Sequence, residues 1–397
     1  MTPPAIRFGI PLLIAIGLIW GFLALNSGGP EGRPLAFSLA IGAAFGAVLQ
    51  RGRFCFYCNF RDLIEKREAS GVIAILVALA VGAIGYTIIF GAWLPTPAPG
   101  RLPPTAHIGP VSVTLVIAAL AFGVGMVISG SCLSAHFYRL AEGSVISPFA
   151  IVGAGLGFGL GFLTWNPLFL AVTSNAFILW LPNVLDYAGA LLVTLALLIG
   201  LGILTLWWSR PIQPQTAEPL TLREAGQAIF IRRWPGVLAG IAVGVISTFA
   251  YFRVAPLGVT AELGSIVRTA GMQWSLLPGT LFGLDGLRGC ATVIKEALLS
   301  NNGLFVIGLI GASFIASLIA GQFKPRRLTG LDVARGLGGG LLLGWGAMTA
   351  LGCTVGVLLS GIHAGSLSGW IFLFAMSLGI LATLWLGRRL RSRFAAA

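Results

Sequence analysis

Apolar runs long enough to cross a lipid bilayer recur along this 397-residue chain, and they constrain its fold more than any other feature. A membrane-spanning helix needs about 20 apolar residues, because the hydrocarbon layer is about 30 Å thick. Hydrophobic residues make up 57% of the sequence and charged residues 9%. The sequence therefore predicts an all-α polytopic membrane protein, with spans near residues 6–25, 35–49, 71–94, 111–128, 148–170, 188–207, 236–250, 304–320, 336–349 and 370–386.

Several of these runs are shorter than a full span and are interrupted by glycine, serine or proline. Such interruptions are typical of discontinuous or re-entrant helices, which in transporters surround the substrate site. The 56 glycines fit this interpretation, since glycine permits close helix contacts and broken helices in a bilayer. The interruptions lie beside Cys55, Cys132, Cys290 and Cys353, so these positions mark the candidate site.

The formal charge of +13 comes from arginines and lysines that gather in short segments between the apolar runs. This distribution is typical of the cytoplasmic loops of membrane proteins, so it favours a role in topology over nucleic-acid binding. It predicts that residues 51–68, the linker 208–234 and both chain termini face the cytoplasm. The first run has no evident small-residue cleavage site, and we expect it to be retained as a helix.

Two sequence motifs occur twice in the same order. GAAFGAVLQRG at residues 42–52 matches GTLFGLDGLRG at residues 279–289, and GVGMVISGSC, ending at Cys132, matches GWGAMTALGC, ending at Cys353. A repeated pair of motifs indicates an internal duplication. We therefore expect two pseudo-symmetric halves with short re-entrant or broken helices meeting at a central pathway. The predicted division is an N-terminal helix and loop (1–34), a first half (35–207), a linker (208–234) and a second half (235–397).

Each duplicated motif places a cysteine just after a glycine-containing break, in RGRFC, SGSC, LRGC and ALGC. At such a break a thiol can face a cavity, while helix N-termini and backbone N–H groups supply partial positive charge. An anion with a soft sulfur end suits such a site, because thiols are polarisable and amides serve oxygens. The alternative is that each cysteine is a small buried hydrophobe.

Cys55 and Cys58 also form a C-x-x-C motif, which is typical of redox proteins. A membrane thiol–disulfide oxidoreductase is therefore an alternative function. The second copy has no counterpart of Cys58, which favours transport over redox chemistry. A membrane scaffold for sulfur-trafficking enzymes is a third possibility. The three histidines show no metal-ligand spacing, so no metal or other cofactor is predicted.

Four charged residues lie beside the cysteine motifs. Arg139 and Glu142 follow Cys132 in a weakly polar stretch, where ionisable residues are functional candidates or interfacial ion pairs. Arg51 and Arg288 occupy matching places in the first repeated motif. Each of them could stabilise an anion near the cytoplasmic mouth or set topology, and topology is the favoured interpretation. The four are predicted to support the cysteine pathway.

The cysteine segments resemble the YeeE/YedE (sulfur transport domain) family of membrane proteins, which includes thiosulfate importers and SoxT-like proteins. The resemblance covers residues 35–386 approximately and is carried by LQRGRFCFYCNFRDL, GMVISGSCLSAHFYRLAEGS and GLLLGWGAMTALGCTVG. It implies an all-helical fold in which thiols hand thiosulfate along by weak S–H contacts. The implied path residues are Cys55, Cys132 and Cys353, with Cys290 at the repeat's counterpart of Cys55.

The resemblance also implies where the protein works and with what partners. It suggests an importer in the bacterial inner membrane that makes no covalent change to its substrate. Cys58 and the pair Ala135–His136 stand where the family more often has small residues, which bears on the sulfur species accepted. No TusA-like carrier sequence is present, so we expect a TusA-like sulfur carrier or a rhodanese to be a separate partner. No GxxxxGK[ST] motif occurs, and a gradient, downstream consumption or a partner must supply the energy.

Overall fold

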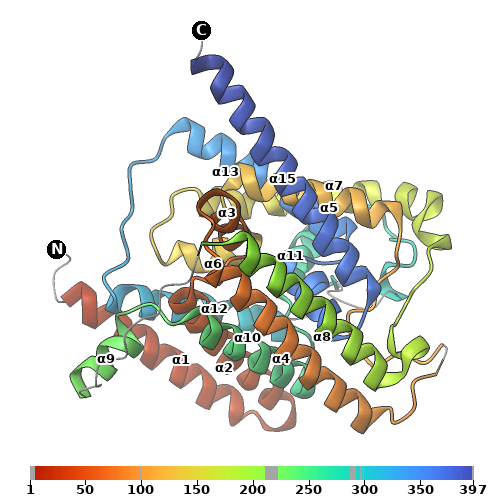
Figure 1. Cartoon of the computed structure of the whole chain (residues 1–397). Helices are drawn as coiled ribbons and strands as arrows, with labels where there is room; N and C mark the ends of the chain where they lie inside the picture. Colours follow the sequence, from red (N-terminus) through yellow and green to blue (C-terminus); the bar gives the residue numbers. More distant parts are fainter. Residues whose placement is uncertain are drawn as a thin grey trace.

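The computed structural model describes residues 5–98, 100–210, 222–286, 292–295, 297 and 299–395. Regular structure in these ranges is helical and no strand forms, apart from three isolated β-bridges. Nine helical segments there are long and apolar enough to cross a membrane, and a bent helix pair supplies a tenth candidate. The predicted all-α polytopic architecture is confirmed, and the long helices run side by side (Figure 1).

The helices closely follow the predicted apolar runs, because in lipid a run of apolar residues must satisfy its backbone hydrogen bonds internally and a helix does so along its whole length. Up to the linker they are α1 (Ile10–Asn26), α2 (Gly29–Gly52), α3 (Phe56–Lys66), α4 (Ser70–Trp93), α5 (Val113–Ser129), α6 (Leu133–Leu140), α7 (Ser147–Ala171) and α8 (Pro182–Trp208). After it come α9 (Leu222–Phe230), α10 (Gly236–Arg253), α11 (Val259–Gln273), α12 (Asn301–Ile319), α13 (Gly330–Thr349), the π-helix η4 (Thr354–Ser360), α14 (Gly361–His363) and α15 (Leu367–Ala395).

The closest helix pairs join the two predicted halves of the chain. α2 packs on α12, α4 on α10, and both α5 and α7 on α13. Glycines allow these approaches: a β-carbon at Gly42 would overlap the carbonyl oxygen of Phe305, and one at Gly340 would overlap that of Ala150. Small residues at helix contacts are how membrane helices gain packing energy when lipid is as apolar as they are. The halves therefore interlock, and their pseudo-symmetry stays a prediction.

The two repeated motifs differ in how far their structures agree. Residues 123–132 and 344–353 both form the end of a long helix, a turn and then a cysteine. In the other pair, residues 42–52 lie within α2, whereas residues 279–286 form turns with a short 3-10 helix, η3 (Leu284–Gly286). The likeness in sequence therefore gives a common local structure at only one of the two pairs.

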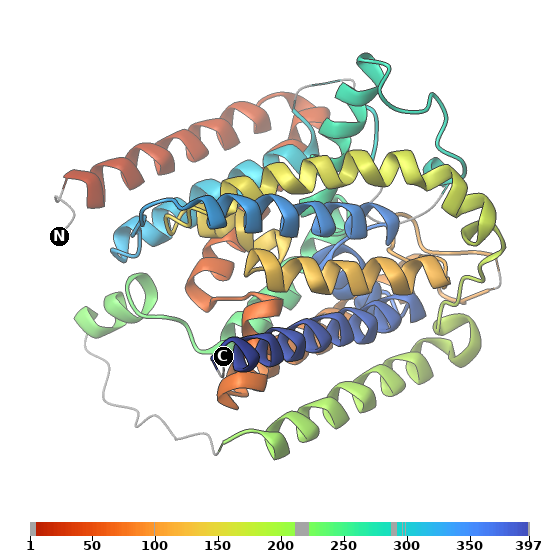
Figure 2. The same ribbon diagram turned by 90° about the horizontal axis from the view of Figure 1, so that it is seen from above.

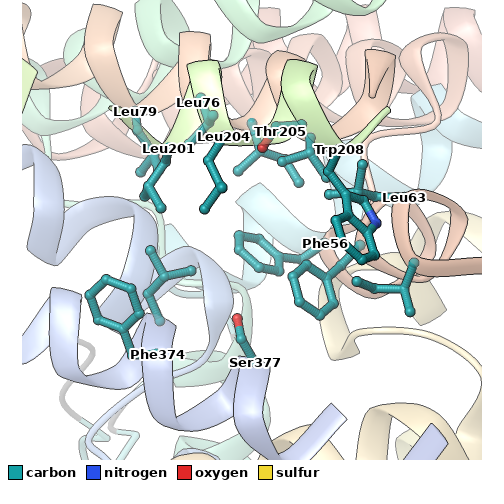
Figure 3. A pocket seen from close by; sticks show the side chains of 15 residues that line it. Phe56, Leu63, Leu76, Leu79, Leu201, Leu204, Thr205, Trp208, Phe374 and Ser377 are labelled. Atoms are coloured by element: carbon teal, nitrogen blue, oxygen red, sulfur yellow. The ribbon is translucent and has the colours of Figure 1, made fainter. Parts of the chain in front are cut away.

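The chain ends lie toward one end of the molecule. In Figure 2 the start of α1, the linker helix α9 in light green and the end of α15 all lie toward the left. α8 packs mainly on α4, and beside it an apolar groove of about 310 Å³ opens between α8, α15 and the α3–α4 region. Figure 3 shows Leu204 and Trp208 facing Phe56 and Phe374 across it. No thiol lines the groove, so it is separate from the cysteine contacts described next.

Candidate functional site

Three helix breaks position three of the predicted cysteines. Cys55 begins α3, Cys132 begins α6 and Cys353 begins η4, each with extended backbone at the cysteine. A residue with positive φ precedes each cysteine within two positions: Arg53 at 48°, Gly130 at 82° and Leu351 at 62°. The left-handed turn ends one helix and redirects the chain, so the next helix starts at the thiol. Helix N-termini therefore meet at the cysteines, as the glycine-containing motifs predicted.

Cys55 and Cys132 form a close thiol pair at the junction of two breaks. Their Sγ atoms lie 3.8 Å apart, and the Oγ atom of Ser131 lies 3.5 Å from the Sγ atom of Cys55. The Cys58 backbone N–H donates to the Cys55 Sγ at 3.4 Å. Cys55 is 0% exposed and Cys132 3% exposed, and both are free thiols. The pair thus offers polarisable sulfur beside a hydroxyl and an amide donor.

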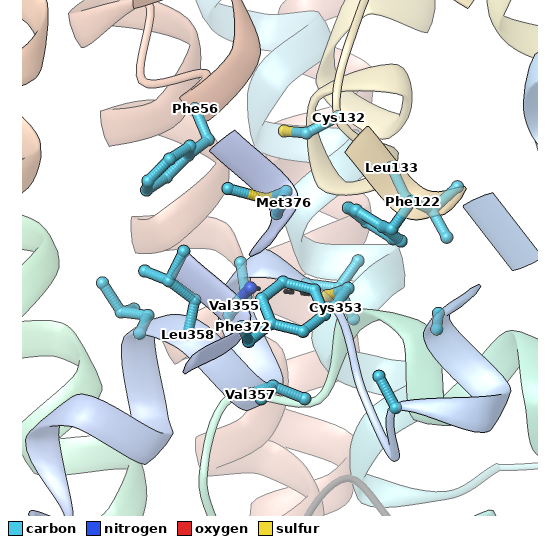
Figure 4. Packing of buried hydrophobic residues seen from close by; sticks show 14 of the residues in the cluster. Phe56, Phe122, Cys132, Leu133, Cys353, Val355, Val357, Leu358, Phe372 and Met376 are labelled. Atoms are coloured by element: carbon cyan, nitrogen blue, oxygen red, sulfur yellow. Dashed lines mark hydrogen bonds between the residues drawn. The ribbon is translucent and has the colours of Figure 1, made fainter. Parts of the chain in front are cut away.

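Cys353 is joined to this pair by helix α6. Its Sγ atom accepts the backbone N–H of Val355 at 3.4 Å and lies 3.9 Å from the Ser134 Oγ atom, which belongs to the first turn of α6. Figure 4 shows Cys132 and Cys353 among apolar side chains that include Phe122, Leu133 and Met376. The beginning of the short helix therefore contacts Cys55 through Cys132 and Cys353 through Ser134, two residues later.

These surroundings favour weak contacts over tight binding. The contacts of the three sulfur atoms come from serine hydroxyls, backbone amides and one another, and aromatic and aliphatic side chains pack around them. A soft anion here would meet polarisable sulfur and N–H dipoles without a strong fixed charge to trap it. Conduction needs binding that is favourable but weak and spread over several sites.

Cys290 and Arg288 lie outside the described residues. Cys58, by contrast, lies on α3 one turn from Cys55, partly exposed, and contributes its backbone N–H to that thiol.

Arg51, Arg139 and Glu142 belong to a polar network that extends from the end of α2. Arg51 is 2% exposed and donates from Nε to Gln50 Oε1 at 2.7 Å and from Nη2 to Gln322 Oε1 at 2.8 Å. Gln50 Nε2 donates to Gln322 Oε1 at 2.7 Å and to Glu142 Oε1 at 3.4 Å. Arg139 approaches Glu142 at 4.0 Å. Arg51 is thus a buried structural centre, which an interpretation based on topology alone did not predict.

Sequence reasoning missed the polar partners of the site. Ser131 and Ser134 flank Cys132 within the quoted motif, so the hydroxyls beside a cysteine were a usable signal. Gln50 is next to Arg51, but Gln322 is 272 residues away from its Gln50 contact and no sequence pattern pointed to it. Only the packing of α12 against α2 brings the two glutamines together.

The histidines have structural surroundings. His136 Nδ1 lies 3.1 Å from Ser147 Oγ, and His363 lies 3.1 Å from both Ser247 Oγ and the Ala78 carbonyl oxygen. Burial lowers the pKa of His107, in the loop between α4 and α5, to about 4, so this ring is neutral at pH 7. Among the described residues, no group of three or more histidine, cysteine, aspartate or glutamate side chains could hold a metal ion.

Several known transporters are similar to this chain in sequence. The chain is 27% identical over 362 residues to the thiosulfate transporter TsuA of Escherichia coli K12, covering 88% of this chain and 93% of that one. It is 30% identical over 362 residues to the thiosulfate transporter TsuA of Spirochaeta thermophila, covering 88% and 97%. The probable transporter YedE of Salmonella typhimurium is 30% identical over 204 residues, covering 51% and 48%. The model of the sulphur transport family matches residues 51–382, and the chain therefore belongs to this family of transporters rather than to an enzyme family.

Proposed function

We propose that this multi-pass transporter imports thiosulfate and hands the ion between the thiols of Cys55, Cys132 and Cys353. Two similar proteins are named thiosulfate transporters, and each matches almost its whole length to this chain. The observation that carries the relay is the 3.8 Å approach of the Cys55 and Cys132 sulfurs across two helix breaks. Cys290, at the repeat's counterpart of Cys55, is proposed as a further contact.

The relay requires an ion with one soft end. Thiosulfate presents a terminal sulfur that can accept a weak S–H contact from each cysteine, while its oxygens face amide and hydroxyl donors such as the Cys58 and Val355 N–H groups. The thiols stay reduced, and no covalent bond to the ion forms or breaks. Sequential weak contacts let the ion leave each site as readily as it enters.

The proposed direction of transport is into the cytoplasm. We infer a bacterial inner membrane location with both termini in the cytoplasm, because the basic segments and both chain ends lie toward one end of the molecule. Arg51, Arg139, Glu142 and Arg288 would then act at the cytoplasmic mouth. A separate TusA-like carrier or rhodanese would accept the sulfur there and draw uptake forward by consuming it.

Purified protein in liposomes tests the proposal. We expect uptake of sulfur-labelled thiosulfate that unlabelled thiosulfate displaces far better than sulfate, because sulfate has the same charge but only hard oxygens. Each lost contact costs less than about 1 kcal/mol, so losing two or three weakens binding by roughly tenfold. Equal competition by sulfate would remove the reason for placing thiols along the path.

Cys58 separates the relay from the oxidoreductase alternative. A C-x-x-C catalyst needs its second thiol to resolve a mixed disulfide, whereas Cys58 supplies a backbone N–H to Cys55. Cys58→Ser should therefore retain most thiosulfate uptake. Loss of uptake together with a trapped Cys55 mixed disulfide, detected by mass spectrometry, would favour redox chemistry instead.

A further inference from the structure

A polar cavity lies behind the break that carries Cys132. It has a volume of about 300 Å³ and lies between the end of α5, the turn from α6 to α7 and the segment that leads into α13. Four cationic side chains line it, together with one carboxylate, Glu142: Arg139, Lys324, Arg326 and Arg335. We call this space the basic cavity.

Two of the arginines each use one N–H group to cap a helix, which leaves their other N–H donors available to a ligand. Arg139 donates from Nη1 to the Gly130 carbonyl oxygen at 3.1 Å, and Arg335 donates from Nε to the Ile128 carbonyl oxygen at 3.1 Å. Both contacts cap the C-terminus of α5, where exposed carbonyls carry partial negative charge. A guanidinium has five N–H donors, so each arginine keeps others for a ligand.

The other two cations differ from each other in their pairing. Arg326 is held in a bidentate ion pair by Asp332, with N–O distances of 2.7 Å and 2.5 Å. Lys324 donates its backbone N–H to the Glu142 carbonyl oxygen at 3.1 Å, while its ammonium has no hydrogen bond or ion pair to the part of the chain that the structure describes. Lys324 therefore adds charge to the cavity without supporting a helix end.

The carboxylate in the cavity does not neutralise it. Glu142 lies 4.0 Å from Arg139, at the outer limit of an ion pair, and shares its other oxygen with Gln50 at 3.4 Å. A divalent anion could displace Glu142 from Arg139 at little cost, because a contact of this length contributes little. The cavity thus combines positive charge, N–H donors and a weakly held counter-ion.

We propose that the basic cavity binds divalent sulfur oxyanions, sulfate and thiosulfate alike, at the end of the molecule where the chain termini lie. Its donors are charged N–H groups and not thiols, so it should not distinguish a sulfur end from an oxygen end. Ser129 and Gly130 line it and lead directly to Ser131 and Cys132. An anion held there would therefore slow release from the proposed thiol path, a consequence that rests on the proposed function.

Binding can be tested without transport. Thermal unfolding of the full chain in neutral detergent is measured by tryptophan fluorescence. The melting temperature should rise saturably as sodium sulfate replaces sodium chloride at constant ionic strength. Lys324→Glu should raise the half-saturating sulfate concentration about tenfold, since it reverses a charge close to a divalent ion. Thiosulfate should give the same result as sulfate.

A matched control separates the cavity from general salt effects. Lys66→Glu changes the same charge at an exposed position that pairs with Asp62 outside the cavity, and it should leave the half-saturating concentration unchanged. Equal values in the wild type and in Lys324→Glu would overturn the proposal. So would a response to thiosulfate alone, which would place the anion at the thiols. A third outcome is that added anionic phospholipid, and not sulfate, raises the melting temperature and that Lys324→Glu abolishes this rise. That outcome would assign the cavity to a lipid headgroup.

Uptake then tests the consequence. Sulfate enclosed in the liposome lumen, on the side where the termini lie, should slow thiosulfate uptake in the wild type and several-fold less in Lys324→Glu. Uptake into sulfate-free liposomes gives the reference rate for each protein. Absence of any uptake by the wild type would contradict the proposed function while leaving the binding result intact, so the two failures are distinguishable.

Discussion

Two thiols that are 77 residues apart in sequence approach to 3.8 Å, and the contacts around them decide what this site can bind. Serine hydroxyls and amide N–H groups contact the sulfurs, whereas Arg51 and Glu142 are linked to each other through Gln50. In the proposed relay, recognition of sulfur is therefore separate from recognition of charge. A buried fixed charge beside the thiols would bind a divalent anion tightly but release it slowly.

At this scale the first prediction concerns the shared thiols. Replacing Cys55, Cys132 or Cys353 singly with alanine should abolish thiosulfate uptake, because each removes a step that the others cannot bridge. Serine should restore uptake poorly, since its hard oxygen is a weaker partner for a terminal sulfur. Uptake in liposomes, with circular dichroism to check folding, measures the effect. Normal uptake in two of the three alanine variants would end the relay.

A second prediction at residue scale concerns Arg51. Arg51→Lys should lower the free energy of unfolding by about 2 kcal/mol, because an ammonium cannot contact Gln50, Gln322 and the Phe230 carbonyl oxygen together. Arg53→Lys, at a residue outside this network, is the matched control and should change stability little. Thermal unfolding in detergent distinguishes them. Similar melting temperatures for both variants would contradict a structural role for Arg51 and favour the interpretation that it only sets topology.

The sequence could predict which residue types form the site but not their partners. Glycine-containing breaks gave the positions of Cys55, Cys132 and Cys353, because the chain must leave the helix there. The contacts of Gln322 with Gln50 and of Ser134 with Cys353 span 272 and 219 residues. Such contacts depend on helix packing, which leaves no local pattern in the chain.

Among the helices, close glycine contacts set which elements can pack together. α13 presents Gly340 and Gly344 to the backbone of α7 and Gly346 to that of α5. The apolar runs predicted the spans well, since their length is fixed by the bilayer. They could not predict the turns at residues 279–286. The sequence of this segment is similar to that of the helical motif in α2, and only tertiary packing distinguishes the two segments.

The matched glycines of α13 provide the test at element scale. Gly340→Ala should destabilise the fold by roughly 1–3 kcal/mol, because its new β-carbon overlaps the Ala150 carbonyl oxygen and must push α7 away. Gly338→Ala adds a β-carbon with nothing within 4 Å and should be neutral or slightly stabilising. Melting temperatures in the same detergent compare the two. A larger loss for Gly338→Ala would contradict this packing.

Over the whole molecule, the number of crossings agrees with the position of the chain ends. The described residues contain nine candidate spans, and counting the bent pair as one span gives ten, an even number that would return the chain to its starting side. The start of α1 and the end of α15 do lie toward one end (Figure 2). The distribution of basic residues also predicts that this end faces the cytoplasm, and that orientation stays a prediction.

Reporter fusions check this arrangement. Green fluorescent protein fused after residue 397 should fluoresce in cells, because it folds in the cytoplasm. Alkaline phosphatase inserted in the loop between α4 and α5 should be active, since it folds only outside the inner membrane. The opposite pair of results would invert the orientation and with it the proposed direction of transport.

The glycine contacts between α2 and α12, and between α7 and α13, also limit how this transporter can alternate between its two faces. Where two backbones touch without intervening side chains, no free volume remains between the helices. The long helices therefore form a rigid unit that resists a rocking motion of one half against the other. Transport by swinging one half of the protein against the other would break these contacts on every cycle. Motion confined to the short helices α3 and α6 and to η4 would leave them intact. We therefore expect a narrow gate that admits single ions, with little change in the outline of the protein within the membrane.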